Sequence, residues 1–139
     1  MNNEKYLALM SALNYCYDNE KQLTINWNNG LIVSCTSITG EYETDTEPGD
    51  ENYIGEYAAA VGDVKVLRQG TDSSVEIYND CIEISLKCIP EKVSLEDGTV
   101  LWENKNWISL IKLKQNLNST DIQIIKELIK DLRDALGGE

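Results

Sequence analysis

The sequence contains no histidine and no phenylalanine among its 139 residues. Histidine is the commonest general base near neutral pH and the commonest metal ligand. Its absence excludes triads of the Ser-His-Asp and Cys-His types. Without phenylalanine, the core must be filled by tryptophan, tyrosine and the aliphatic side chains.

Signals for export and for membrane insertion are also lacking. The segment Met1-Asn2-Asn3-Glu4-Lys5 has no basic region followed by a long apolar run, so we expect neither a signal peptide nor a transmembrane helix. The spacing of the four cysteines fits no zinc or Cys-x-x-Cys pattern; they are Cys16, Cys35, Cys81 and Cys88. We therefore expect buried, reduced thiols and a cytoplasmic location.

Positive charge is absent from a long central window. Between Gln22 and Val64 there is no lysine or arginine, while the same window holds eight carboxylates, and the whole chain has a net charge of −12. Binding to nucleic acid or to an anionic membrane requires clustered basic residues, so we expect neither as a partner. A basic protein is the partner that this charge favours.

The apolar pattern predicts one α+β domain over residues 1–139, mainly of antiparallel strands. We expect a helix over 3–18, a β-rich segment over 22–113 and a second helix over 120–136. Apolar residues recur at helical spacing in the first helix, at Tyr6, Leu9, Met10, Leu13 and Tyr17. Thr120 and Gln123 form a capping-box pattern at the start of the second helix.

The first hairpin has a register that burial decides. A three-residue loop at Asn28-Asn29-Gly30 brings two apolar sets to one face, whereas a two-residue turn would separate them. The pairs expected are Leu23 with Cys35, Ile25 with Val33 and Trp27 with Leu31. This register predicts a positive φ at Gly30.

Further strands follow the first hairpin. The second strand is expected to continue to Tyr42 with a bend or bulge at Gly40, and a third to run over 56–67 with a bulge at Gly62. A turn at Asn79-Asp80 would pair Ile77 with Ile82, Val75 with Ile84 and Glu76 with Glu83. A type I′ turn at Asp97-Gly98 would pair Val93 with Trp102 and Leu95 with Val100. Trp107–Leu113 forms a last candidate strand.

The order of these elements favours a small barrel or a strongly bent sheet, flanked by the two helices. A helix, a strand at Leu23–Trp27, an Asn-Gly turn and a long strand bending at Gly40 together resemble an Sm-like or SH3-like small β-barrel. The RNA-binding signatures of the Sm family are missing, since Glu41-Tyr42-Glu43 follows Gly40 and Val66-Leu67-Arg68-Gln69 ends the third strand. The resemblance therefore implies a barrel topology and no RNA binding.

Seven of the carboxylates lie in the loop-like stretch Glu41–Glu56. Asp45 and Glu56 have the spacing of the outer ligands of an EF-hand loop, but Gly49 and Asp50 occupy positions five and six, where a ligand and a glycine are needed. We therefore predict no metal site and no cofactor. Tyrosines lie among the charges and supply rigid contact area. The predicted partner-binding residues are Glu41, Tyr42, Glu43, Asp45, Glu47, Asp50, Glu51, Tyr53, Glu56 and Tyr57.

These observations favour a non-enzymatic protein-interaction module whose acidic loop contacts a basic protein. A solvated loop with no partner is the structural alternative. Three functional alternatives stay open: an immunity-type inhibitor of a toxin, an enzyme that uses paired carboxylates, and a structural subunit of a phage-like assembly. The sequence does not identify the oligomeric state.

Overall fold

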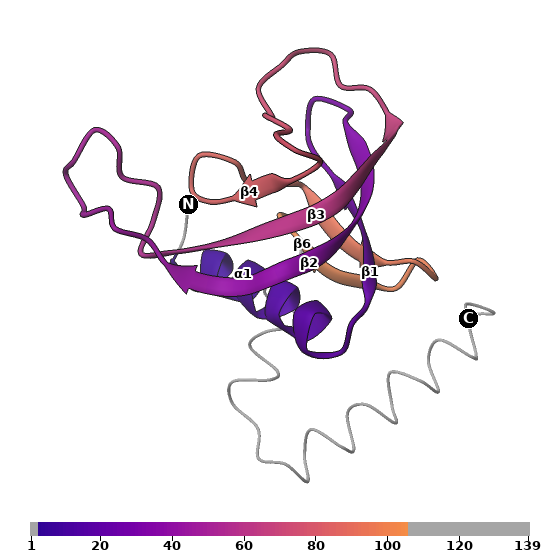
Figure 1. Cartoon of the computed structure of the whole chain (residues 1–139), viewed down its shortest axis with the longest axis horizontal. Helices are drawn as coiled ribbons and strands as arrows, with labels where there is room; N and C mark the ends of the chain where they lie inside the picture. Colours follow the sequence, from indigo (N-terminus) through magenta and orange to yellow (C-terminus); the bar gives the residue numbers. More distant parts are fainter. Residues whose placement is uncertain (1–2, 106–139) are drawn as a thin grey trace, which may run out of the picture. The chain divides into compact units, whose positions relative to one another are not determined.

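The computed structural model describes residues 3–105, which contain one helix and six strands (Figure 1). These residues belong to a compact unit that spans Met1–Trp107. The expected strand at Trp107–Leu113 and the expected helix at 120–136 lie outside the described residues, and the single-domain organisation stays a prediction. In chain order the elements are α1 (Asn3–Asp18), β1 (Gln22–Asn26), β2 (Ile32–Glu43), β3 (Tyr57–Arg68), β4 (Ile82–Ile84), β5 (Lys92–Leu95) and β6 (Val100–Glu103).

The six strands form one antiparallel sheet in the order β4-β3-β2-β1-β5-β6. Within residues 3–105, β4 and β6 are the two edges and do not pair with each other, so of the two expected forms, a small barrel or a strongly bent sheet, the barrel is wrong. A three-residue β4 and a four-residue β6 leave little length for closure. The α+β class and the N-terminal helix are confirmed. The resemblance to Sm-like barrels in strand order stays a prediction.

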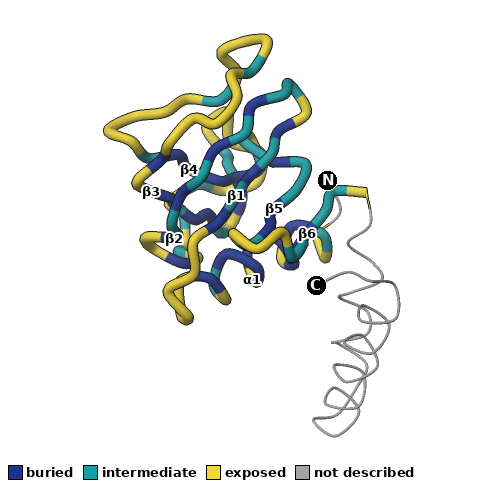
Figure 2. Tube along the Cα trace, turned by 90° about the vertical axis from the view of Figure 1, so that its right-hand side faces the viewer, coloured by how far each residue is buried: buried dark blue, intermediate teal, exposed yellow. Residues whose placement is uncertain are grey.

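The core lies between α1 and one face of the sheet. Val33, Ile25, Val93 and Trp102 are successive cross-strand neighbours on β2, β1, β5 and β6, and all four are buried. Figure 2 shows buried stretches along α1 and along the strands. The indole Nε1 of Trp102 donates a hydrogen bond to the backbone oxygen of Lys5, 3.1 Å away. This contact ties the edge of the sheet to the first turn of α1.

The amphipathic pattern of α1 is confirmed with one exception. Tyr6, Leu9, Met10 and Leu13 are buried, whereas Tyr17 is 47% exposed. Tyr17 lies against Gly40, where a Cβ would come within 3.2 Å of its ring. The helix therefore ends on β2 with Tyr17 at the rim of the core.

The first hairpin has the predicted register. Leu23 pairs with Cys35 and Ile25 with Val33, and the Trp27 amide donates to the Leu31 carbonyl at 2.9 Å. Gly30 has φ of 92°, as a three-residue loop requires. Burial of the two apolar sets on one face decided this register.

The bulges in the long β2–β3 pair are also confirmed. The ladder shifts between Ser37 and Glu41, where Gly40 has φ of 61°. It shifts again between Ser34 and Thr36, opposite Lys65 and Gly62, where Asp63 has φ of 50°. The extra residue lets both Val61 and Val64 be buried, although Val66 is 39% exposed.

The prediction for the second hairpin is correct in the position of its turn and wrong in its strand pairing. Tyr78 and Cys81 exchange hydrogen bonds around Asn79 and Asp80, which both have positive φ. Instead of pairing with Val75 and Ile77, Ile84 and Ile82 pair with β3. There they meet Ala59 and Val61, which are fully buried, whereas Ile77 is 40% exposed. Glu83 consequently lies opposite Ala60, and the expected Glu76–Glu83 pair does not form.

The third hairpin has the predicted turn position with a different turn type. Val93 pairs with Trp102, but Ser94 rather than Leu95 lies opposite Val100. The Leu95 amide donates to the Thr99 carbonyl at 2.8 Å, and within the turn only Gly98 has a positive φ. The turn is a three-residue loop with a bulge, like the one at Gly30, and not a type I′ turn.

Candidate functional site

The predicted acidic stretch divides into two strand ends and a loop. Glu41, Tyr42 and Glu43 are the last residues of β2, and Tyr57 is the first residue of β3. The loop proper therefore covers residues 44–56 and projects from one end of the β2–β3 pair (Figure 1). All seven carboxylates of the stretch are exposed. We call the ten predicted partner-binding residues, taken together, the acidic surface.

Strand pairing gathers part of the acidic surface on one face. Glu41 and Glu43 are two residues apart on β2, so their side chains share a face of the sheet. Tyr57 pairs with Glu43 and lies on that same face. The charges of Glu56, Glu43 and Glu41, with Glu56 contributing most, raise the pKa of the Tyr57 phenol. These four residues form the continuous part of the acidic surface.

Tyr42 points to the opposite face from its neighbours. Its hydroxyl donates a hydrogen bond to the Glu83 carboxylate on β4. Burial, this hydrogen bond and the charge of Glu83 all raise the pKa of the Tyr42 phenol. Glu83 thus adds a negative charge on β4, the edge strand next to β3. No local pattern in the sequence linked Tyr42 to Glu83.

Threonine hydroxyls join the two ends of the loop through hydrogen bonds. The Oγ1 atoms of Thr44 and Thr46 both donate to the Gly55 carbonyl, and the Ile54 amide donates to Thr46 Oγ1 at 3.2 Å. The Thr44 amide also donates to the Glu56 carbonyl at 2.8 Å. The carboxylates are therefore carried by a loop with fixed ends.

The loop is also tied to the segment after β4. The Leu86 amide donates to the Ile54 carbonyl at 2.9 Å, and Lys87 Nζ donates to the Glu51 carbonyl at 3.1 Å. Lys87 thus reaches a backbone oxygen of the loop. The Glu51 side chain itself is exposed.

A small cavity opens beside the loop. It has a volume of about 200 Å³ and is lined by side chains that include Tyr6, Leu7, Tyr53, Glu56, Tyr57 and Leu86. The hydroxyl of Tyr6 donates to the Tyr57 carbonyl, which fixes the first turn of α1 against the start of β3. The tyrosines of the acidic surface are thus divided, with Tyr53 and Tyr57 at the cavity and Tyr42 at Glu83. Sequence reasoning missed Tyr6, Leu86 and Glu83, because only the tertiary fold brings them to the site.

The described residues show no arrangement typical of a metal centre or a membrane anchor. No group of three or more Cys, Asp or Glu side chains within residues 3–105 is placed to hold a metal ion. In the same range no helix is long and apolar enough to cross a membrane.

The four cysteines, all within the described range, are free thiols. Burial raises the pKa of Cys16 to about 11 and that of Cys35 to about 12.

Comparison with known proteins finds a match to a protein-family model. No curated protein and no solved structure matches the chain. The model of the cognate immunity protein YxxD matches residues 4–106, which include α1 from its second residue, the six described strands and the acidic surface. The match covers well over half of the sequence, and the chain therefore belongs to the YxxD family of cognate immunity proteins.

Proposed function

We propose that this chain is a non-enzymatic inhibitor that binds a toxin and covers a basic part of its surface with the acidic surface. The observation that carries the proposal is the family match over residues 4–106. An immunity protein acts on a partner protein, which fits a surface built for contact. The sequence alone predicted a general protein-interaction module, with an immunity-type inhibitor as one alternative. The family match favours that alternative and indicates a toxin as the partner.

The charge distribution supports this mode of inhibition. The acidic surface carries seven exposed carboxylates within a window of the sequence that has no lysine or arginine. Complementary charge speeds association and excludes partners of the wrong sign. Exposed carboxylates of this kind lack the desolvated cleft that acid–base catalysis uses, which favours binding over an enzymatic role.

The tyrosines and the cavity support a defined contact rather than a diffuse one. Tyr53 and Tyr57 line the cavity of about 200 Å³ beside the loop. Tyrosine is enriched at interface hot spots, which pair with pockets on the facing protein. A side chain of the toxin that enters this cavity would fix the register, while the surrounding carboxylates steer the approach. The four free thiols support action in a reducing compartment such as the cytoplasm.

The test is co-expression with a candidate toxin, sought among the genes beside the one that encodes this chain, followed by calorimetry on the purified pair. We expect the chain to restore growth of cells that produce the toxin, and a complex whose affinity falls at least tenfold between about 0.05 and 0.3 M salt. Growth arrest in the presence of the folded chain, without complex formation, would refute the proposal.

A matched pair of variants tests the surface itself. Glu41→Ser with Glu43→Ser removes two charges from the acidic surface, and Glu76→Ser with Glu96→Ser removes two exposed charges elsewhere. We expect the first variant to weaken binding at least tenfold and the second less than twofold, because only the first removes charges from the surface proposed to contact the toxin. Equal effects of the two variants would show that the acidic surface is not the contact.

A further inference from the structure

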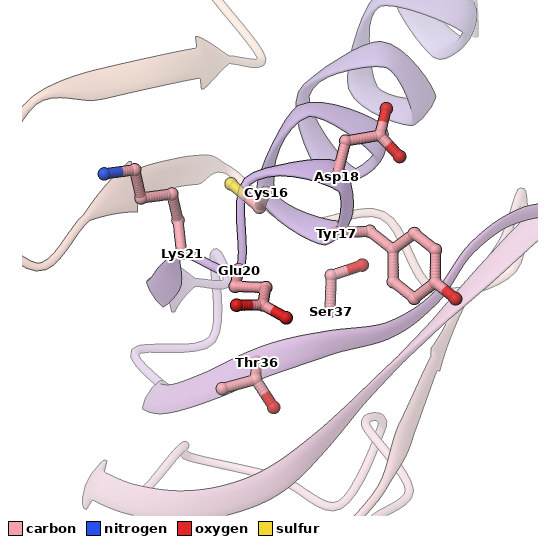
Figure 3. A pocket seen from close by; sticks show the side chains of 7 residues that line it. All are labelled: Cys16, Tyr17, Asp18, Glu20, Lys21, Thr36 and Ser37. Carbon is pink, nitrogen blue, oxygen red and sulfur yellow. The ribbon is translucent and has the colours of Figure 1, made fainter.

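A second pocket lies away from the acidic loop, where the end of α1 meets the middle of β2. Its volume is about 520 Å³, within the range of small-ligand sites. Tyr17, Asp18, Glu20 and Lys21 line it from the helix end, and Thr36 and Ser37 line it from β2 (Figure 3). None of these six residues belongs to the acidic surface.

Ser37 forms part of the pocket wall and is only 9% exposed. Its Oγ has no hydrogen-bond partner among residues 3–105. Figure 3 shows this hydroxyl pointing into the space between α1 and β2, on the side of Tyr17. Buried hydroxyl groups are normally satisfied, because an unpaired one destabilises the folded state. The oxygen itself is closed to solvent, so a ligand that brings a hydrogen-bond donor would satisfy it once the Ser37 side chain turns toward the pocket.

Glu20 is held in a backbone conformation that its residue type disfavours. The Lys21 amide donates to the Cys16 carbonyl at 2.9 Å and the Glu20 amide to the Tyr17 carbonyl at 3.4 Å, which together make a Schellman motif. Glu20 occupies the left-handed position of this motif with φ of 53°, where glycine or asparagine is usual. Strain of this kind is often kept where a side chain has a function.

The charge of the pocket favours a cation. The carbonyl end of a helix carries partial negative charge, and the last turn of α1 has no basic residue to offset it. Asp18 and Glu20 add two carboxylates against the one ammonium group of Lys21, so the side chains of the lining carry a net negative charge. In the view of Figure 3 the Glu20 carboxylate points toward β2, while the Lys21 side chain extends away from Ser37 and the Asp18 carboxylate points away from β2. The exposed ring of Tyr17 adds an aromatic face beside the pocket.

A planar cation with several N–H groups fits this set of groups best. A guanidinium can bond a carboxylate and a hydroxyl at once and can stack on an aromatic ring. We propose that this pocket binds the guanidinium group of an arginine side chain presented by the toxin. This assignment rests on the proposed inhibitory function and adds a second contact to the acidic surface.

The first measurement tests the chemistry without the toxin. Nα-acetyl-arginine methylamide is titrated into the 15N-labelled full chain, with the neutral isostere Nα-acetyl-citrulline methylamide as the control. We expect saturable shifts of the amides at Tyr17, Glu20, Thr36 and Ser37 with the arginine probe and none with the citrulline probe. Shifts that are equal for the two probes, or that do not saturate, would overturn the site.

The second measurement uses variants that keep the fold. Ser37→Ala removes an unpaired buried hydroxyl, and Glu20→Gly relieves the left-handed residue, so both should raise or preserve Tm. We expect each to weaken binding of the arginine probe and of the toxin at least fivefold. Glu96→Gln, an exposed carboxylate in the β5–β6 turn, should change both affinities less than twofold.

The outcomes separate the two proposals. If the wild-type chain does not bind the toxin, the proposed function fails, whatever the arginine probe does. If the wild type binds the toxin and both pocket variants bind it equally well, the inhibitory function stands and the pocket assignment is overturned. Higher Tm together with weaker binding in Glu20→Gly is the result that a purely structural role for Glu20 does not produce.

Discussion

The hydroxyl of Tyr42, near the end of β2, donates a hydrogen bond to the carboxylate of Glu83 on β4, with β3 lying between the two strands. Burial raises the pKa of the Tyr42 phenol, and the hydrogen bond and charge of Glu83 raise it further. Burial likewise raises the pKa of Tyr6, whose hydroxyl bonds to the Tyr57 carbonyl. Both phenols thus hold their protons more tightly in the folded chain than in the unfolded one.

Alkaline pH should therefore destabilise the protein through these two tyrosines. Above about pH 10 the unfolded chain releases phenolic protons that the folded chain retains, so stability that is present below pH 10 is lost as pH rises. Tyr42→Phe should reduce this loss by on the order of 0.5 kcal/mol between about pH 10 and 11, a value discounted for the partial exposure of Tyr42. Urea unfolding at a series of pH values measures it, and parallel curves for the two proteins would contradict the prediction.

Burial of the thiols should make most of them unreactive. Cys16 and Cys35 are each 1% exposed, and burial raises the pKa of Cys88 to about 11. At about pH 8 we expect these three thiols to react with Ellman's reagent at least about 100-fold more slowly in the folded protein than in guanidinium. Cys81 and Cys88 are both partly exposed, and because burial raises the pKa of Cys88, Cys81 should give the fast phase, which Cys81→Ser removes. Fast labelling of Cys16 or Cys35 in the folded chain would show that the core opens readily.

Gly62 and Ile38 should be coupled across the β2–β3 pair. A Cβ at Gly62 would lie 2.9 Å from Cγ2 and 3.1 Å from Cδ1 of Ile38. Gly62→Ala should therefore cost about 1–3 kcal/mol of unfolding free energy, and less than about 0.5 kcal/mol when Ile38→Ala is also present. Gly30→Ala is the control, because nothing lies within 4 Å of its Cβ and φ is 92°. It should cost about 1 kcal/mol from backbone strain with or without Ile38.

Local patterns predicted the parts of the fold that burial alone decides. The register of the first hairpin follows from the alternation of Leu23, Ile25 and Trp27, since a slip of one residue would expose the whole set. The pairing of β4 was missed because alternation does not name the partner strand. Ile82 and Ile84 find a fully buried neighbour in β3, which a local hairpin with Val75 and Ile77 could not supply.

The candidate sites also combine features that the local sequence predicts with features that only the tertiary fold creates. Exposure of the seven carboxylates follows from their density, which no core could accept. The contact of Tyr42 with Glu83 spans 41 positions in the sequence, so no local signal pointed to it. Ser37 did leave a signal, because it continues the buried parity of Leu31, Val33 and Cys35 with a hydroxyl. A polar residue at an inward-facing position of a strand therefore indicates a candidate site from the sequence alone.

Order in the acidic loop should depend on Thr46. Its hydroxyl accepts from the Ile54 amide and donates to the Gly55 carbonyl, both at 3.2 Å. Thr46→Val removes both bonds, so we expect amide exchange at Ile54 to quicken about tenfold while global stability falls by less than about 1 kcal/mol. Hydrogen exchange followed by NMR measures the local change.

Thr46→Ser keeps the hydroxyl and should restore slow exchange at Ile54. If the acidic surface contacts the toxin, Thr46→Val should also weaken the complex severalfold, because a looser loop loses more conformational entropy on binding. Faster exchange at Ile54 with unchanged affinity would mean that the toxin does not contact the loop, and would confine the contact to the strand-borne residues Glu41, Glu43 and Tyr57.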